Sequence, residues 1–362
     1  MGGQIEAPDA VIPISGGRLT LPEGPIFHLK RADQCVYELG EFRAWAGYKN
    51  FGADEATDGV ALFQHVLSFA HSGKTGRTGV HAHLAHSHIV IPTSGRGVFS
   101  YDGVLTEAIP GSVIVQHGGT VHDQFEYSYA ASSVEENNQT KQFVEPAPPD
   151  AGKQSFGFLE LFVPKAFANV EIVPPALVSE ADQASAWSHP YHLAGCRFAI
   201  QQPDAPDAAY HPVAGRGDLE IRDAQTWEPS GRLVATWIIR PIAGAPSEGQ
   251  PFSPVIVGEA GGFDILYMVG GSASFRKADG EIFALNTGDT LTCDPGAAAL
   301  PFDCSADMRL LKFFVAGRCE RLRRRTREEI DQLEHLGARI ITRREVRPSG
   351  DVRPINGLQP LD

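Results

Sequence analysis

The sequence has few cysteines, a deficit of positive charge and no long apolar run. Its five cysteines are odd in number, widely scattered and without a Cys-x-x-Cys pair, which argues against a disulfide framework and against a zinc ribbon. Lys and Arg number 31 against 44 Asp and Glu, so the formal net charge is -13, and this sign argues against nucleic acid as a partner. No apolar run approaches membrane-spanning length. The first residues, with Glu6 among them, resemble neither a signal peptide nor a myristoylation site. We therefore expect a cytoplasmic protein with free, buried thiols that binds neither nucleic acid nor membranes.

The length and the composition predict a globular protein with more than one domain. Hydrophobic residues make up 42% and charged residues 21% of the sequence, which is ordinary for a globular protein. A chain of 362 residues is too long for one small barrel and can bury two separate cores.

Histidine is abundant in one short part of the chain. Six of the 13 histidines lie between Gly79 and Phe125, and they are His81, His83, His86, His88, His117 and His122. Imidazole is the commonest metal ligand, and a single site needs three or four ligands that converge. The cluster therefore predicts a metal site.

The spacing of the first four histidines predicts which of them share a face. If the stretch is extended, the side chains of His81 and His83 project to the same side of the strand. On a straight strand the side chains of His86 and His88 project to the other side. A third ligand from this stretch therefore requires a turn or bulge after His83. Ala85 and Ser87 are short enough to permit one.

The last two histidines flank a predicted turn. A hydrophobic run ends at His117, Gly118-Gly119 follows, and His122 comes three residues later. This pattern is typical of a strand, a tight turn and the start of the next strand. Such a turn can direct His122 back toward His81 and His83.

The two clusters resemble the motifs of the cupin superfamily, which are roughly G-x5-H-x-H-x3,4-E-x6-G and G-x5-P-x-G-x2-H-x3-N. The positions that match are His81, His83 and Gly95 in the first motif, and Gly111, Gly119 and His122 in the second. The departures are Thr75 for the leading glycine, His88 for glutamate, His117 for proline and Glu126 for asparagine. The resemblance implies that His81, His83, His88 and His122 bind a metal ion. An alternative is a three-histidine site in which His88 only forms a hydrogen bond beside the ligands.

Replacing the motif glutamate by His88 makes the predicted ligand set all-histidine and removes one negative charge from it. The presence of a metal is therefore better determined than its identity. His86 and His117 are expected outside the ligand set. Together with Glu126 and Tyr101, they are the candidates for a catalytic base, and the spacing selects none of them.

An internal repeat predicts two copies of one module. Phe263–Phe275 parallels Ser87–Phe99, Gly288–Cys293 parallels Gly111–Gln116, and Leu310–Val315 parallels Phe158–Val163. In this register the second copy has lost the metal ligands, because the four histidine positions hold Val257, Glu259, Asp264 and Ala299. Two carboxylates alone make a poor transition-metal site. We expect the second copy to have a structural role; the alternative is that Glu259 and Asp264 line a pocket.

Short β-rich runs separated by Gly, Pro, Asn and Asp predict an all-β fold, and the resemblance implies two tandem jelly-roll barrels with a long linker and a short C-terminal helix. The expected division has an N-terminal arm (1–57), a barrel with the metal site (58–165), a linker (166–230), a degenerate barrel (231–316) and a basic helix and tail (317–362). The helix is predicted from the capping box Thr326–Glu329 and the stop at Gly337. The polar stretch from 128 to 155 is expected to be a long loop.

The fold alone does not determine an activity. A neutral histidine shell leaves the full charge of the metal to act on an anionic chelating substrate, so we expect a non-heme Fe(II) dioxygenase that acts on a small aromatic or enolic compound. Two alternatives stay open: an isomerase or lyase with Mn, Ni or Zn that acts on a small carbonyl or sugar-like compound, and a non-catalytic protein that binds a small molecule. The resemblance also implies a homodimer, for which the sequence assigns no interface.

Overall fold

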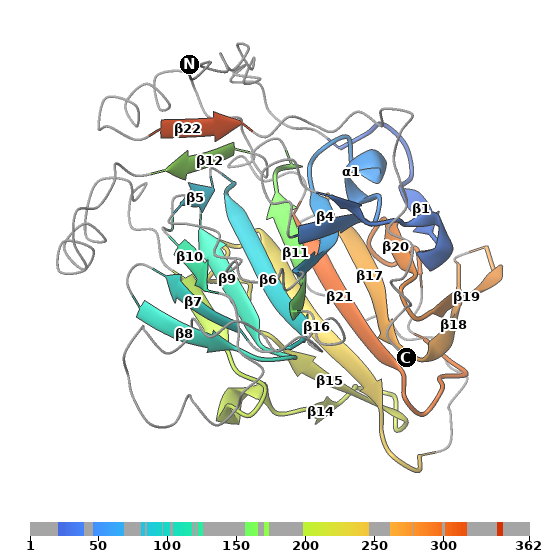
Figure 1. The fold of residues 1–362 in the computed structure, drawn as a ribbon. Helices are drawn as coiled ribbons and strands as arrows, with labels where there is room; N and C mark the ends of the chain where they lie inside the picture. The colour runs from blue at the N-terminus through green and yellow to red at the C-terminus, as the bar shows by residue number, and fades with distance from the viewer. Residues whose placement is uncertain are drawn as a thin grey trace.

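The architecture comes from a computed structural model, which describes residues 21–39, 46–68, most of 81–125, 156–165, 170–173, 198–245, most of 261–316 and 339–342. The described residues form two seven-stranded antiparallel sheets and three smaller ones (Figure 1). Their helical content is limited to α1 (Ala53–Ala56) and two 3₁₀ turns, η1 (Ala32–Gln34) and η5 (Pro206–Ala208). The all-β fold predicted from the sequence is confirmed.

The first large sheet belongs to the N-terminal barrel. In spatial order it contains β13 (Phe198–Gln201), β9 (Val113–His117), β6 (Ser87–Ser94), β11 (Phe156–Val163), β4 (Leu62–Ser68), β3 (Ala46–Asn50) and β2 (Glu38–Leu39). A three-stranded sheet completes the barrel, with β10 (His122–Phe125), β7 (Gly97–Tyr101) and β8 (Val104–Ala108). Val90, Phe99 and Phe158 are among the buried residues that fill the space inside.

The second large sheet belongs to the C-terminal barrel. Its strands are β1 (Phe27–Lys30), β20 (Thr290–Cys293), β17 (Phe263–Gly270), β21 (Arg309–Val315), β16 (Val234–Pro241), β15 (Leu219–Asp223) and β14 (His211–Pro212). The hairpin of β18 (Ser272–Arg276) and β19 (Ile282–Asn286) completes this barrel. A separate core with Leu266, Phe275 and Leu310 lies inside it.

The two large sheets pack against each other through their outer faces. One hydrophobic cluster contains residues of both sheets, including Phe63, Leu161 and Phe313, and the rings of Phe63 and Phe313 lie 5.3 Å apart between centroids. Figure 1 shows β6, β11 and β4 crossing in front of β16, β21 and β17. Because the central strands are buried on both faces, their sequences are almost continuously hydrophobic rather than alternating.

The strand registers confirm the internal repeat. His88 pairs with Gln116 and Phe162, and Asp264 pairs in the same way with Cys293 and Phe314. The turns repeat as well: φ is 70° at Gly95 and 68° at its counterpart Gly271. A side chain would be strained at both positions, so glycine is kept in both copies.

Segments outside the predicted barrel limits also contribute strands. From the predicted arm, β1 pairs with β20 of the second barrel, and from the predicted linker, β13 pairs with β9 of the first barrel. The two large sheets thus include strands from outside the predicted barrel ranges 58–165 and 231–316. The division of the chain into domains remains a prediction.

A third small sheet joins parts of the chain that are distant in sequence. It contains β22 (Arg339–Thr342), β12 (Val170–Val173) and β5 (Ala82–His83), in that order. The predicted C-terminal helix, the loop of 128–155, Val257, Glu259 and Ala299 lie outside the described residues. Cys35 and Cys293 are buried free thiols and Cys304 is a half-buried one. No helix in the described ranges is both long and apolar enough to cross a membrane.

Candidate metal centre

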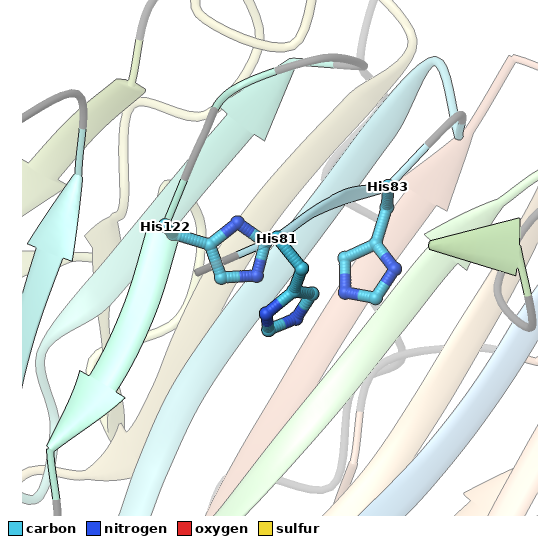
Figure 2. A group of neighbouring side chains, drawn as sticks. All are labelled: His81, His83 and His122. Carbon is cyan, nitrogen blue, oxygen red and sulfur yellow. The ribbon is translucent and has the colours of Figure 1, made fainter. Parts of the chain in front are cut away.

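Three of the four predicted ligands lie together inside the N-terminal barrel. His81, His83 and His122 are buried, and each offers a ring nitrogen within 4.8 Å of those of the other two. Their ring centroids are separated by 4.2 Å for His81 and His122 and by 5.1 Å for each of the other pairs. Figure 2 shows the rings of His81 and His122 beside each other, with that of His83 next to them on the same side of the backbone.

Backbone hydrogen bonds hold these histidines in place. His81 N donates to His122 O at 2.9 Å, and His122 N donates to His81 O at 2.7 Å. This reciprocal pair places the two residues directly opposite each other on antiparallel segments. His83 is on β5, which pairs with β12, and β12 pairs with β22. The three histidines therefore project from short extended segments that neighbouring strands fix on both sides.

One hydrogen bond determines the tautomer of His122. Its Nδ1 lies 3.0 Å from the carbonyl oxygen of Thr120. A carbonyl can only accept, so Nδ1 carries the hydrogen and Nε2 keeps its lone pair. A backbone carbonyl in this position is a common orienting partner of a metal-binding histidine.

His88 lies beside the three histidines but is not part of the group that can share one ion. Its ring centroid is 5.0 Å from that of His83 and 6.3 Å from that of His122. The ring stacks on Phe162, with a centroid separation of 3.9 Å and an angle of 11°. Its Nε2 is 3.4 Å from Oε1 of Glu160. A ligand role for His88 therefore remains a prediction.

Tyr101 is a predicted catalytic candidate that lies beside the site. It pairs with His122 in the ladder of β10 and β7, its ring centroid is 5.9 Å from that of His122, and its side chain is fully buried. Its hydroxyl has no hydrogen-bond partner among the described residues. Burial raises the pKa of this hydroxyl well above its ordinary value, and the charge of Glu160 raises it further. Tyr101 therefore stays a neutral phenol, which can donate a proton. This suits the role of an acid better than the role of a base predicted from the sequence.

Of the other predicted candidates, His86 and His117 belong to the described strands and loops. His86 is half-buried, and its backbone N–H donates to Val163 O at 2.8 Å. His117 ends β9 opposite Ser87. Glu126 lies outside the described residues.

Glu160 is a member of the site that sequence reasoning missed. It follows Phe158 and precedes Phe162 on the inner face of β11, and its side chain is 12% exposed. Its Oε2 accepts a hydrogen bond of 2.8 Å from Nε2 of Gln64. A charged residue in the middle of a buried apolar strand was the signal that could have found it.

The residues present fit a divalent metal ion. Three buried imidazoles are a suitable donor set for iron, manganese, nickel or zinc. Their donor nitrogens lie within 4.8 Å of one another, a separation at which all three can bind one ion. As expected from the sequence, Asp264 stands at the position of His88 in the second barrel, where Lys312 Nζ contacts its carboxylate at 2.9 Å.

Only the comparison with solved structures gives similar proteins. A scan against models of protein families gives no match, and a search of curated proteins gives none either. Among solved structures, the coconut allergen cocosin is similar with a TM-score of 0.50 and 10% identity, over 82% of this chain and 87% of that one. This is a two-barrel cupin fold.

Other cupin structures show the same coverage. The oxalate decarboxylase of Lactobacillus farciminis has a TM-score of 0.49 and 11% identity, over 80% of this chain and 86% of that one. Procruciferin, an 11S globulin of Brassica napus, has a TM-score of 0.48 and 9% identity, over 80% and 84%. A fold alone does not determine an activity, so an activity has to be argued from the site.

Proposed function

We propose that this cupin is a metal-dependent enzyme, and more specifically a non-heme Fe(II) dioxygenase that acts on a small chelating aromatic or enolic substrate. The observation that carries the proposal is the buried group of His81, His83 and His122, with donor nitrogens within 4.8 Å of one another. All three ligands are neutral, so an ion held there keeps its full positive charge. A ferrous ion with three protein ligands would supply open positions for a substrate and dioxygen.

The surroundings support an anionic substrate. Burial lowers the local dielectric and strengthens the attraction between the ion and an oxygen anion. A substrate with two adjacent oxygens would satisfy two coordination positions at once. The interior of a small barrel limits the space beside the ion. A small chelating compound is therefore the expected partner.

The protein residues have separable tasks in this proposal. The Thr120 carbonyl orients His122, and the Phe162 ring supports that of His88. The ring of Tyr101 lies 5.9 Å from that of His122 between centroids, and its hydroxyl is buried. The barrel wall around them excludes water, which protects reactive species during turnover.

A second candidate is Lewis-acid isomerase or lyase chemistry with Mn, Ni or Zn. The observation that favours it is Tyr101, whose ring lies beside that of His122 and whose buried hydroxyl has no partner among the described residues. A hydroxyl in that place can give a proton to a carbonyl oxygen or to a carbanion. This chemistry needs no oxygen, so the two candidates differ in a measurable way.

The test begins with metal content. Untagged protein is analysed by mass spectrometry beside the double variant His81→Ala/His122→Ala and a control, His211→Ala, whose histidine is exposed on β14. We expect near-stoichiometric metal in the wild type and the control and none in the double variant. Absence of metal from the wild type, even after reconstitution, would overturn the proposal and leave a binding protein.

Turnover then distinguishes the activities. Oxygen uptake is measured with catechols and with β-diketones, and anaerobic conversion is measured with small hydroxy acids and sugars. Oxygen uptake that disappears in the double variant and persists in His211→Ala would support the dioxygenase. Metal-dependent conversion without oxygen would support the second candidate instead.

A further inference from the structure

Three polar side chains form a chain across neighbouring strands of the N-terminal barrel. Gln64 on β4 donates to Oε2 of Glu160 on β11, and Oε1 of Glu160 faces Nε2 of His88 on β6. The strands lie next to each other in the order β6, β11, β4. His88 and Glu160 are only 5% and 12% exposed. A buried carboxylate with polar partners on both oxygens is held in a defined position.

His88 has unused hydrogen-bonding capacity. Neither of its ring nitrogens makes a complete hydrogen bond to a described residue, although its ring is buried and stacked. Buried polar atoms in native proteins nearly always have partners. Glu160 can serve as the partner of Nε2. The distance of 3.4 Å between Nε2 and Oε1 of Glu160 exceeds an ideal N–H···O distance by only about 0.5 Å. The other nitrogen, Nδ1, still requires one.

We propose that Glu160 supplies, from a neighbouring strand, the carboxylate that the motif position of His88 lacks, and that it acts as a positioning residue for His88. It holds the hydrogen of the imidazole on Nε2 and leaves Nδ1 as an acceptor, on a ring whose centroid is 5.0 Å from that of His83. The ligand for Nδ1 is the metal ion itself or a water or hydroxyl group held at it. This inference rests on the proposed function, because it assumes that a metal is bound there.

The second barrel argues against a purely structural role for Glu160. At the equivalent positions it has Lys312 and Asp264, a simple ion pair. Packing at these positions is thus satisfied without histidine. The combination of carboxylate and imidazole occurs in the barrel with the three grouped histidines, where an oriented imidazole has a use.

The tautomer of His88 tests the inference without any metal. Chelator-treated protein with ¹⁵N-labelled histidine is examined by long-range ¹H–¹⁵N spectroscopy, and the signals of His88 are assigned from their loss in His88→Gln. We expect hydrogen on Nε2 in the wild type and a mixture of tautomers in Glu160→Leu. Hydrogen on Nδ1 in the wild type, or the same single tautomer in Glu160→Leu, would overturn the inference.

Cobalt binding tests the effect on the centre. Glu160→Gln keeps the size and the acceptor for Gln64 but removes the charge, so it is expected to fold normally, with about 10–100-fold weaker Co²⁺ binding and a shifted visible Co²⁺ spectrum. The matched control is Glu228→Gln, the same substitution at a carboxylate whose side chain is 69% exposed, which should leave affinity and spectrum unchanged. An unchanged affinity and spectrum in Glu160→Gln would overturn the inference. Failure of the wild type to bind Co²⁺ would instead overturn the proposed function, and the tautomer would still decide the role of Glu160.

Discussion

Lys312 and Asp264 form an ion pair inside the C-terminal barrel, at the two strand positions that hold Glu160 and His88 in the N-terminal barrel. Lys312 Nζ lies 2.9 Å from Asp264 Oδ2, and both side chains are less than 10% exposed. The ladder registers make the positions equivalent, since β21 pairs with β17 as β11 pairs with β6. The charges are exchanged between the strands, with the anion on β11 in one barrel and on β17 in the other. The second barrel thus holds a pair of opposite charges at the positions where the first barrel holds Glu160 and His88.

Lys312→Met should destabilise the protein strongly. Burial raises the pKa of Asp264 and Lys312 lowers it, so removal of the lysine leaves a carboxylate without its counter-charge in a low-dielectric barrel. Breaking a buried pair in this way costs roughly 3–5 kcal/mol. The measurement is the free energy of unfolding from denaturant titration at pH 7.

The matched variant is Lys312→Met/Asp264→Leu. With neither charge present, most of the lost stability should return, because apolar replacements of a buried pair are often close to neutral. Equal destabilisation of the single and double variants would show that packing, not charge, determines the effect. Metal content should not change in either variant.

Metal removal should lower the stability of the wild type. A ligand that binds only the folded state adds about 2.7 kcal/mol when its free concentration is 100 times its dissociation constant. We expect the unfolding temperature to fall after chelation and to recover on addition of metal. His122→Ala should show neither change, whereas His211→Ala should behave as the wild type. The same metal-dependent shift in His122→Ala would place the ion elsewhere.

The grouping of three histidines at the candidate metal centre could be predicted because its determinants are local in sequence. The parity of His81 and His83 and the Gly118-Gly119 turn before His122 were sufficient to expect these side chains together, and the structure groups them. The repeat was also predictable from local signals. Gly95 and Gly271 occupy equivalent turns with a positive φ, which favours glycine, so both copies carry a glycine that an alignment of the two halves can match.

The remainder depends on contacts between distant segments. Glu160 reaches His88 from 72 positions further along the chain, and no spacing rule predicts that approach. The same holds for the strand exchange, in which β1 joins the second barrel and β13 the first. Edge pairing of this kind is decided by the packing of the finished sheets and not by local propensity.

Removal of β22 should weaken metal binding without unfolding the barrels. This strand pairs with β12, which pairs with the β5 segment that carries His83. A chain that ends at Ala338 loses this support, and we expect about tenfold weaker Co²⁺ binding, the lower end of the range for lost supporting contacts. A chain that ends at Thr342 keeps β22 and serves as the control. Equal affinities of the two truncated chains would show that β22 does not position His83.

His65 should make the protein less stable in mild acid. It is buried on β4 between the Tyr37 hydroxyl, 2.7 Å from Nδ1, and Thr93 Oγ1, 2.8 Å from Nε2. Burial lowers the pKa of His65 to about 3, and the nearby charge of Lys49 contributes to the shift. The unfolded chain, with a histidine pKa near 6.5, takes up the proton first as the pH falls. This contribution is therefore complete above about pH 6.5 and is lost progressively between pH 6.5 and 3.

The expected size of the effect is about 2 kcal/mol between pH 7 and pH 5, from 1.36 kcal/mol for each pH unit below 6.5. Denaturant unfolding at the two pH values measures it. Carboxylates add their own pH dependence, so the informative quantity is the difference between variants. His65→Gln should reduce the loss of stability by about that amount, while His211→Gln, at an exposed position, should keep the dependence of the wild type. If His65→Gln and the wild type lose the same stability between pH 7 and pH 5, His65 is already able to bind a proton in the folded protein.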